Sequence, residues 1–277
     1  MSLGIAFKGP EGIVLAADSR VTLMAQVNQP GIANPLLLPA SYDNATKMLR
    51  VKGQDYVGAV TYGAGAIGLT EPRTAHSYIP EFEQELAEAS TKRVSTEAFA
   101  QRLSDFFLTR WNASMPGPVQ PGQDMFFLIG GYDEGEPYGR VFEVKIPNEP
   151  APKEHNAGTF GIIWGGQKEF TERLLNGFDG RLVELTQQFL TLSDTQRDGL
   201  VNHLRMNMAV GIPYQFLPLQ DCVNLAIFMI RTTITLQTWL VGVRGVGGFI
   251  DLATITRTDG FKYIQQKVIT GEVGELR

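Results

Sequence analysis

The second residue of the chain, Ser2, carries a hydroxyl and, once Met1 is removed, a free α-amine. Because Ser2 is small, we expect the initiator methionine to be removed. The pKa of a chain-terminal α-amine is ordinarily about 7.7–8.0, so this group can act as a base near neutral pH. A hydroxyl and a base on one residue form a self-contained nucleophile and general base, which is chemistry suited to attacking a carbonyl.

Three polar residues follow the apolar run 13–17, and two of them, Asp18 and Arg20, are charged. At the end of a buried strand such charges need partners, because an unpaired buried charge is costly. Arg20 could orient Asp18 through paired hydrogen bonds. A lysine near the Ser2 hydroxyl would lower the pKa of that hydroxyl and would need a counter-charge, so Lys47 and Asp18 are a candidate pair. Taken alone, Lys47 also fits a solvated strand edge and Asp18 also fits a turn.

A glycine-rich segment, Gly63-Ala64-Gly65-Ala66, follows the strand expected over 56–62. Small residues between a strand and an expected helical region leave backbone N–H groups open to a developing oxyanion. The alternative is a tight turn that needs glycine for a positive φ. In the company of Ser2, Asp18 and Lys47, we favour the oxyanion interpretation.

These landmarks resemble, in order and rough spacing, the proteasome β-type subunits and their bacterial relatives HslV and Anbu, which are N-terminal-nucleophile hydrolases. The opening segment MSLGIAFKGPEGIVLAADSRVT places Ser2 at the family nucleophile and Asp18 at the family aspartate without a gap. The segment TKML, 46–49, resembles the part that carries the catalytic lysine, here Lys47. The segment VGAVTYGAG, 57–65, resembles the strand and turn whose Gly63 N–H contributes to the oxyanion hole.

The resemblance implies a threonine/serine-type peptidase that hydrolyses peptide bonds inside a self-compartmentalising homo-oligomer, either a ring or a helical assembly. It implies a peptide or unfolded protein as substrate and admits an ATP-dependent unfoldase as partner. The residues that it places around the substrate are Val21, Thr22, Ala45, Leu49, Thr61 and Gly65. At positions where active relatives carry an Asp and two Ser that support the terminal amine, this chain has Val243, Val246 and Gln167. Apolar side chains cannot hydrogen-bond an ammonium group.

The hydrophobic pattern predicts the elements that must position these residues. We expect strands over 3–7, 13–17, 48–51, 56–62, 125–132, 140–146, 160–164, 249–256 and 261–268. We expect helices over 72–91, 96–111, from 168 onward, and over 182–192, 195–210 and 219–238. We expect Ser95 or Thr96 to cap the second of these, and Ser193-Asp194 to be a capping site before 195–210. This order does not alternate strictly, so it favours an α+β fold with two antiparallel sheets over a parallel doubly wound sheet. The resemblance implies a four-layer αββα sandwich and a single domain over 1–277.

Two segments exceed what the family usually carries, near 23–45 and 178–217. The first holds three prolines and little periodicity, so we expect a long ordered loop there. Its apolar run 36–38 favours contact with a neighbouring subunit, although a surface insertion without a role is an equal alternative. The second is expected to be a decoration or a docking surface.

Composition narrows the class of function. A net charge of −5, a pI near 5.3 and the lack of a basic stripe argue against nucleic-acid binding. The single cysteine, Cys222, fits a buried thiol in a reducing cytoplasm. The most apolar later stretch, 222–230, is too short to span a bilayer, so no membrane association is expected. The three histidines are scattered without ligand spacing, so we expect neither a metal nor a cofactor.

Two other classes of function stay open at this point. One is a non-catalytic ring-forming subunit that keeps the fold. The other is an amidohydrolase that acts on a small-molecule amide. Removal of Met1 separates the first alternative from a peptidase, and a substrate panel separates the second.

Overall fold

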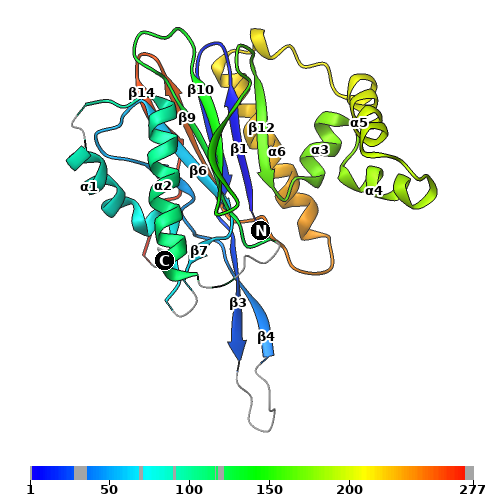
Figure 1. The fold of residues 1–277 in the computed structure, drawn as a ribbon, viewed down its shortest axis with the longest axis horizontal. Helices are drawn as coiled ribbons and strands as arrows, with labels where there is room; N and C mark the ends of the chain where they lie inside the picture. Colours follow the sequence, from blue (N-terminus) through cyan, green and yellow to red (C-terminus); the bar gives the residue numbers. More distant parts are fainter. Residues whose placement is uncertain are drawn as a thin grey trace, which may run out of the picture.

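Two five-stranded antiparallel sheets form the body of the chain (Figure 1), in a computed structural model that describes residues 2–27, 36–68, 71–89, 92–115, 117 and 122–271. The first sheet has the strand order β12 (Gly161–Gly166), β1 (Leu3–Lys8), β2 (Ile13–Asp18), β13 (Ile250–Thr256) and β14 (Gly260–Gln265). The second has the order β11 (Glu149–His155), β10 (Arg140–Ile146), β9 (Met125–Gly131), β6 (Val57–Gly63) and β5 (Met48–Arg50). The α+β class with antiparallel sheets is confirmed.

Strands β1 and β2 are buried along their whole length, which explains their continuous apolar sequence. Alternate residues of a strand point to opposite faces of its sheet. In β2, Val14 and Ala16 join the apolar cluster under helix α6 (Leu219–Thr238), whereas Ile13, Leu15 and Ala17 face the second sheet. The N-terminal hairpin is therefore enclosed from both sides.

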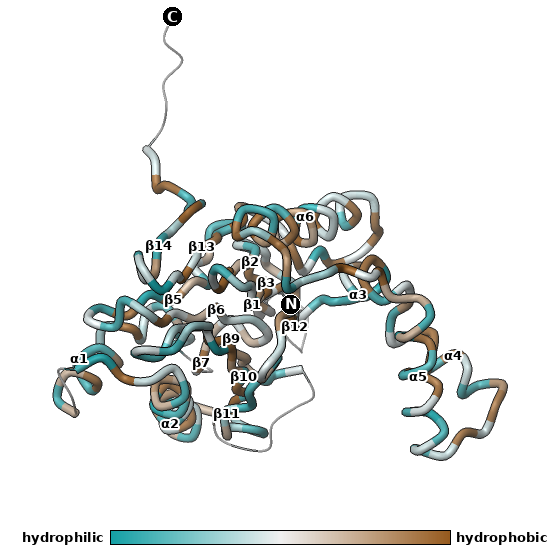
Figure 2. The backbone as a smooth tube through the Cα atoms, turned by 90° about the horizontal axis from the view of Figure 1, so that it is seen from above, coloured by the Kyte–Doolittle hydropathy of each residue, from teal (hydrophilic) through white to brown (hydrophobic). Residues whose placement is uncertain are grey.

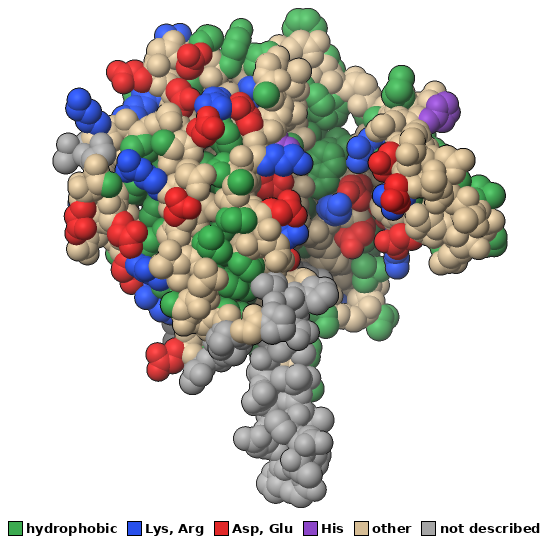
Figure 3. Space-filling model, in the orientation of Figure 1, with side chains coloured by type: hydrophobic (Ala, Val, Ile, Leu, Met, Phe, Trp, Pro, Cys, Tyr) green, Lys and Arg blue, Asp and Glu red, His purple; other side chains and the backbone are tan. Residues whose placement is uncertain are grey.

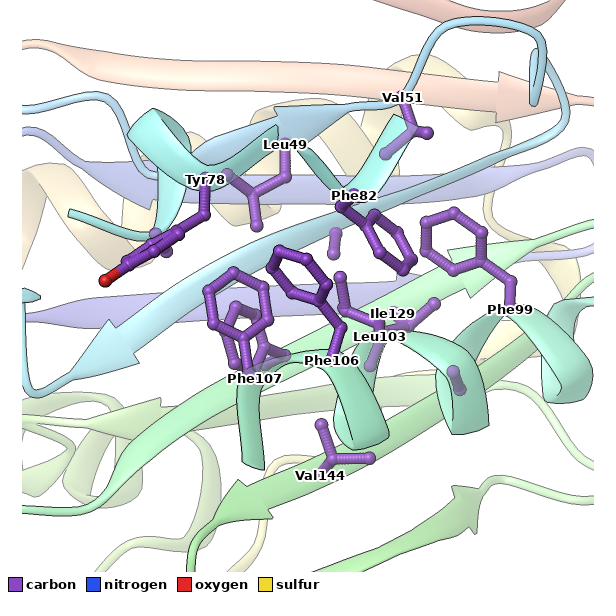
Figure 4. Close-up of a cluster of buried hydrophobic side chains, with 14 of the residues drawn as sticks. Leu49, Val51, Tyr78, Phe82, Phe99, Leu103, Phe106, Phe107, Ile129 and Val144 are labelled. Atoms are coloured by element: carbon purple, nitrogen blue, oxygen red, sulfur yellow. The ribbon is translucent and has the colours of Figure 1, made fainter. Parts of the chain in front are cut away.

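Helices cover the outer faces of the two sheets. Figure 2 shows α6 on one side, next to β2 and β13, and α1 (Ile79–Ala89) and α2 (Thr96–Ser114) on the opposite side. Aromatic side chains from α1 and α2 pack together against β9 and β10, as Figure 4 shows for Phe82, Phe99, Phe106 and Phe107. Burial of this cluster fixes the second sheet against its helices.

Helix α2 begins where the capping signal predicts. The Ser95 hydroxyl accepts a hydrogen bond from the Ala98 N–H. Helix α5 (Asp194–Met208) likewise begins after Ser193, which forms a reciprocal capping box with Gln196. Both predicted caps are confirmed.

Helices α3 (Glu169–Asn176), α4 (Gly180–Phe189) and α5 lead away from the sheets, and α4 and α5 form an arm at one side of the body (Figure 2). Neither α4 nor α5 contains a buried residue. The predicted helices over 182–192 and 195–210 are confirmed in type. Several apolar side chains of the arm, among them Leu185, Phe189 and Met206, are therefore exposed.

The predicted loop over 23–45 was wrong for much of its length. Strands β3 (Val21–Val27) and β4 (Leu36–Tyr42) pair as a two-stranded ribbon that projects from the body (Figure 1). Pro39 is tolerated because β4 has a second edge that pairs with no other strand in the described residues. Of the expected contact run, Leu38 is exposed, and residues 28–35 lie outside the described part of the chain.

Other element predictions also need correction. The expected helix over 72–91 is shorter, because β7 (Ala66–Ile67), β8 (Arg73–Thr74) and a 3₁₀ turn (Ala75–Tyr78) precede α1. Pro80 lies in the first turn of α1, where proline is well accommodated, instead of kinking the helix. Strand β11 was missed because its sequence, EPAPKEH, contains two prolines, which an edge strand tolerates. None of the helices in the described ranges is long and apolar enough to cross a membrane.

Candidate active site

The register of the first hairpin brings the start of β1 to the end of β2. Gly4 lies opposite Ala17, so Ser2 and Leu3 lie beside Asp18. Asp18 is fully buried, and its Oδ1 accepts hydrogen bonds from the Leu3 N–H at 3.0 Å and from Lys47 Nζ at 2.6 Å. These residues come from three successive segments of the N-terminal part of the chain, and the fold brings them to one point.

The other carboxylate oxygen of Asp18 is held by the backbone. Its Oδ2 accepts the N–H of Arg20 at 3.1 Å and the N–H of Gly247 at 3.0 Å. Donors therefore satisfy both oxygens, as a buried carboxylate requires. The arrangement fixes the position of the negative charge that faces Lys47.

Lys47 is almost as buried as its partner, with 7% of its side chain exposed. Burial lowers the pKa of the Lys47 ammonium, and the charge and hydrogen bond of Asp18 oppose that change. A lysine in this state is a strong local source of positive charge that can also lose its proton more readily than a lysine in water. Such a group can lower the pKa of a neighbouring hydroxyl.

Ser2 and Lys47 line the same narrow cavity. Its lining residues are Ser2, Val21, Ala45, Thr46, Lys47, Thr61, Tyr62, Gly63, Ala64, Gly65, Thr74 and Ala75. Four of the six predicted substrate-binding residues are among them, namely Val21, Ala45, Thr61 and Gly65. The Thr61 Oγ1 is buried and has no hydrogen-bond partner among the described residues.

The other two predicted substrate-binding residues, Thr22 and Leu49, do not line this cavity. Thr22 follows Val21 on β3 and points the other way, where its hydroxyl lies 3.0 Å from the Ser41 hydroxyl. Leu49 is buried in the apolar cluster under α1 and α2 (Figure 4). Because side chains alternate along β3, Val21 and Thr22 point to opposite faces of the ribbon. The Leu49 side chain packs against the helices instead of lining the cavity.

The N–H of Gly63 faces the side of β6 on which the catalytic candidates lie. Two residues earlier, the Thr61 N–H donates to the Lys47 carbonyl at 3.0 Å, and N–H groups two apart on a strand share a side. Gly63 itself has φ of 83°, and a Cβ there would lie 2.4 Å from the Asp124 carbonyl. The backbone therefore requires glycine here, and the Gly63 N–H points toward the edge of β6 at which Lys47 lies.

The predicted role of Arg20 was wrong in its detail. The Arg20 guanidinium pairs with Asp43, at 2.5 Å from Nε to Oδ1 and 2.8 Å from Nη2 to Oδ2, and only its backbone N–H reaches Asp18. Hydrogen bonding to Arg20 lowers the pKa of Asp43. Asp43 directly follows β4, and its contact with the Arg20 side chain depends on how the ribbon β3–β4 folds, which the sequence alone does not reveal.

Sequence reasoning also missed several residues that hold the site. Gly247 supplies a backbone N–H donor to Asp18. Only glycine fits at this position, because a Cβ would lie 2.4 Å from the Arg20 guanidinium. The doublet Gly247-Gly248 was the available signal, since adjacent glycines before a strand often mark close backbone contact. Two further charged residues, Asp251 and Lys267, gave no local signal.

Two of the three positions at which active relatives are expected to carry a polar side chain hold valine in this chain, Val243 and Val246. Val246 is buried in the apolar cluster under α6, and Val243 is 48% exposed. Gln167 lies at the site through its backbone, because its N–H donates to the Ser2 carbonyl at 2.7 Å. Its Oε1 is buried without a hydrogen-bond partner among the described residues.

Tyr62 lines the same cavity, and its ring leaves room only for glycine at two neighbouring strand positions. Its ring lies so close to Gly4 and Gly165 that a Cβ would stand 2.9 Å from Tyr62 Cδ1 at the first and 2.1 Å from Tyr62 Cζ at the second. The Tyr62 hydroxyl donates to Glu143 Oε1 at 2.5 Å, and burial raises the pKa of Tyr62. Glu143 in turn lies 3.0 Å from His155 Nε2.

A larger cavity, of about 610 Å³, lies in the arm. It is lined by Arg173, Gly177, Phe178, Asp179, Arg181, Leu182, Glu184, Leu185, Gln188 and Met208. This set contains no hydroxyl, thiol, imidazole or amine nucleophile, so the narrow cavity at Ser2 is the better candidate for covalent chemistry. Across the described ranges, no three His, Cys, Asp or Glu side chains converge to hold a metal ion. Cys222 is buried, and burial raises the pKa of its thiol to about 11.

Comparison with known proteins places the fold. No protein-family model matches the chain, and no curated protein matches it in sequence. In structure the chain is similar to a (Gly-1) mutant of Anbu from Hyphomicrobium sp. strain MC1, with a TM-score of 0.54 and 16% identity. The similarity covers 96% of this chain and 86% of the other. Anbu is among the proteasome-like proteins that the N-terminal landmarks resemble, so the sequence resemblance and the structural similarity point to the same fold.

Proposed function

We propose that this chain is a proteasome-like N-terminal-nucleophile hydrolase that cuts peptide bonds, with Ser2 as nucleophile. The observation that carries the proposal is the buried Asp18–Lys47 pair beside Ser2, at a cavity that Gly63 also lines. The similarity in fold to Anbu supports it. We also propose that the chain forms a single domain with a four-layer αββα arrangement.

In the proposed reaction, the α-amine of Ser2 takes the proton of the Ser2 hydroxyl as the oxygen attacks the substrate carbonyl. Lys47 lowers the pKa of that hydroxyl, and Asp18 holds Lys47 in place. The Gly63 N–H donates to the oxyanion. The amine then gives its proton to the departing amine of the substrate, and water hydrolyses the resulting ester.

We further propose that the chain assembles with copies of itself in the cytoplasm. Its substrate would be unfolded protein, which an ATP-dependent unfoldase could deliver. The arm supports self-assembly, because no residue of α4 or α5 is fully buried within the chain. Several of their apolar side chains are exposed, and hydrophobic atoms lie along the outer edge of the arm in Figure 3. They include Leu185 and Phe189 of α4 and Met206 and Met208 of α5.

A structural subunit of the same fold is the second candidate. The apolar Val246 and the exposed Val243, in place of groups that would support the amine, favour it. A hydrolysis panel tests the choice: purified protein is offered fluorogenic peptides and small-molecule amides, beside Ser2→Ala. Peptide turnover that Ser2→Ala abolishes supports the peptidase. Turnover of small amides alone supports an amidohydrolase, and no turnover at all supports the structural subunit.

A further inference from the structure

A second buried ion pair lies beside the Asp18–Lys47 pair. Asp251 of β13 pairs directly with Lys267, which follows β14, and their side chains are only 2% and 10% exposed. The Lys267 backbone N–H also donates to Asp251 Oδ1 at 3.0 Å. Asp251 therefore holds both the backbone and the side chain of Lys267. The proposed reaction makes no use of either residue.

Ser19 connects this second pair to the end of β2. Its hydroxyl donates to Asp251 Oδ2 at 3.5 Å and accepts from Lys267 Nζ at 3.3 Å. Ser19 is fully buried and directly follows Asp18 in the chain. A change at Asp251 or Lys267 therefore reaches the candidate site through a single intervening residue.

The backbone of Ser19 is attached to both halves of the first ion pair. Its N–H donates to the Gly247 carbonyl at 3.0 Å, and the Gly247 N–H donates to Asp18. Its carbonyl accepts the Ala45 N–H at 2.9 Å, two residues before Lys47. Ser19 thus lies between the segment that carries the carboxylate and the segment that carries the amine.

We propose that the C-terminal segment is part of the candidate site, where Asp251 and Lys267, joined to the Asp18–Lys47 pair through Ser19, are positioning residues whose opposite charges set the charge state of Lys47. The two charges also act on Lys47 through space, with Lys267 disfavouring and Asp251 favouring its charged form. The charged groups around Lys47 come from several elements: Asp18 of β2, Asp43 before β5, Asp251 of β13, Lys267 after β14 and the α-amine of Ser2 once exposed.

The test is a titration of Lys47 in the full chain by ¹³C NMR of labelled lysine side chains, with the resonance assigned by its loss in Lys47→Arg. Lys267→Met leaves the Asp251 carboxylate near Lys47, so the pKa of Lys47 should rise. Asp251→Asn leaves the Lys267 ammonium, so that pKa should fall. We expect each pKa to change by about 0.5 or more, which is about a threefold change in the ratio of the two forms. Lys262→Met, at an exposed position on β14, is the matched control and should change nothing.

Opposite directions are the decisive result, because a merely loosened structure would expose Lys47 to water and raise its pKa in both variants. Shifts in the same direction, or none, overturn the proposal. Asp251→Asn with Lys267→Met removes both charges, so the pKa of Lys47 should lie between those of the single variants. Lys267→Arg keeps the positive charge, so the pKa of Lys47 in this variant should stay close to its value in the original protein. With several variants, the test does not depend on any one of them that folds poorly.

The catalytic consequence rests on the proposed function, and a second measurement separates the two. The rate at which an electrophilic peptide modifies Ser2 should follow the same shifts along the pH axis. Opposite Lys47 shifts without any Ser2 modification would uphold the positioning pair and contradict the hydrolase. Ser2 modification with an unchanged pH profile would contradict the positioning pair and leave the hydrolase standing.

Discussion

Lys47 Nζ lies 2.6 Å from Asp18 Oδ1, in a contact that leaves 7% of the lysine side chain and none of the aspartate side chain exposed. Two charges removed from water in this way are each costly without the other. The pair therefore makes the stability of the fold dependent on the residues proposed for catalysis.

Lys47→Met should destabilise the protein by about 3–5 kcal/mol, because it leaves the Asp18 carboxylate buried without its counter-charge. Asp18→Asn combined with Lys47→Met should cost less than the sum of the two single changes. Urea denaturation of the four proteins measures the coupling. Strict additivity would show that the two side chains do not interact.

Gly165→Ala should destabilise the protein by about 1–3 kcal/mol or more, because the new Cβ would lie 2.1 Å from Tyr62 Cζ. Adding Tyr62→Ala should recover part of that loss. Gly166→Ala should not be rescued in this way, since its Cβ would meet the Ser2 carbonyl at 1.9 Å and its φ is 94°. Gly199→Ala in exposed α5 is the control, and thermal unfolding should show it equal to or more stable than the original.

Glu143 should contribute to stability in a pH-dependent way. Hydrogen bonds from His155 and then Tyr62 lower the pKa of Glu143 in the folded protein below its ordinary value of 4.5. The unfolded chain then binds more protons in acid, so this contribution is present above pH 4.5 and is lost as the pH falls through the lowered pKa.

Glu143→Gln should therefore reduce the free energy of unfolding near neutral pH and flatten its decline below pH 4.5. Urea midpoints across this range measure the effect, with Glu136→Gln at an exposed turn as control. An unchanged acid slope in Glu143→Gln would contradict the argument.

The arm should mediate self-association. Light scattering of the purified protein should give a mass many times 30.5 kDa. Phe189→Ser with Met206→Ser should lower that mass while leaving the circular dichroism spectrum unchanged, since both side chains are more than four-fifths exposed. Ile269→Ser, also exposed, is the control. A clean monomer at micromolar concentration in the original protein would refute assembly.

Local patterns predicted much of this fold and part of the site. The hairpin β1–β2, helix α6 and the caps at Ser95 and Ser193 depend on apolar periodicity and on side chains that bond nearby backbone, which a sequence records directly. The Asp18–Lys47 contact followed from the need of each buried charge for a partner. The ribbon β3–β4 and strand β11 were missed because their prolines are acceptable only at open strand edges, which depend on the whole sheet.

The rest of the site depends on long-range packing. Asp43 takes the Arg20 side chain, and Asp251 with Lys267 reaches Ser19 from more than 230 positions away in the chain. Leu49 was assigned to the substrate pocket, yet the helices of the second sheet enclose it. None of these outcomes leaves a local pattern in the sequence, because each depends on which distant element arrives at the same place.

The proposed chemistry requires Ser2 to be a nucleophile whose own α-amine is the base. Met1 lies outside the described residues, so its removal is tested by intact-mass measurement, which should find a form without Met1. A peptide epoxyketone should then add to that form, and peptide mapping should place the adduct on Ser2, because ring closure uses both the hydroxyl and the amine. Ser2→Ala should not be labelled. A protein that keeps Met1 in cells, or a processed protein that is never labelled, would contradict the account.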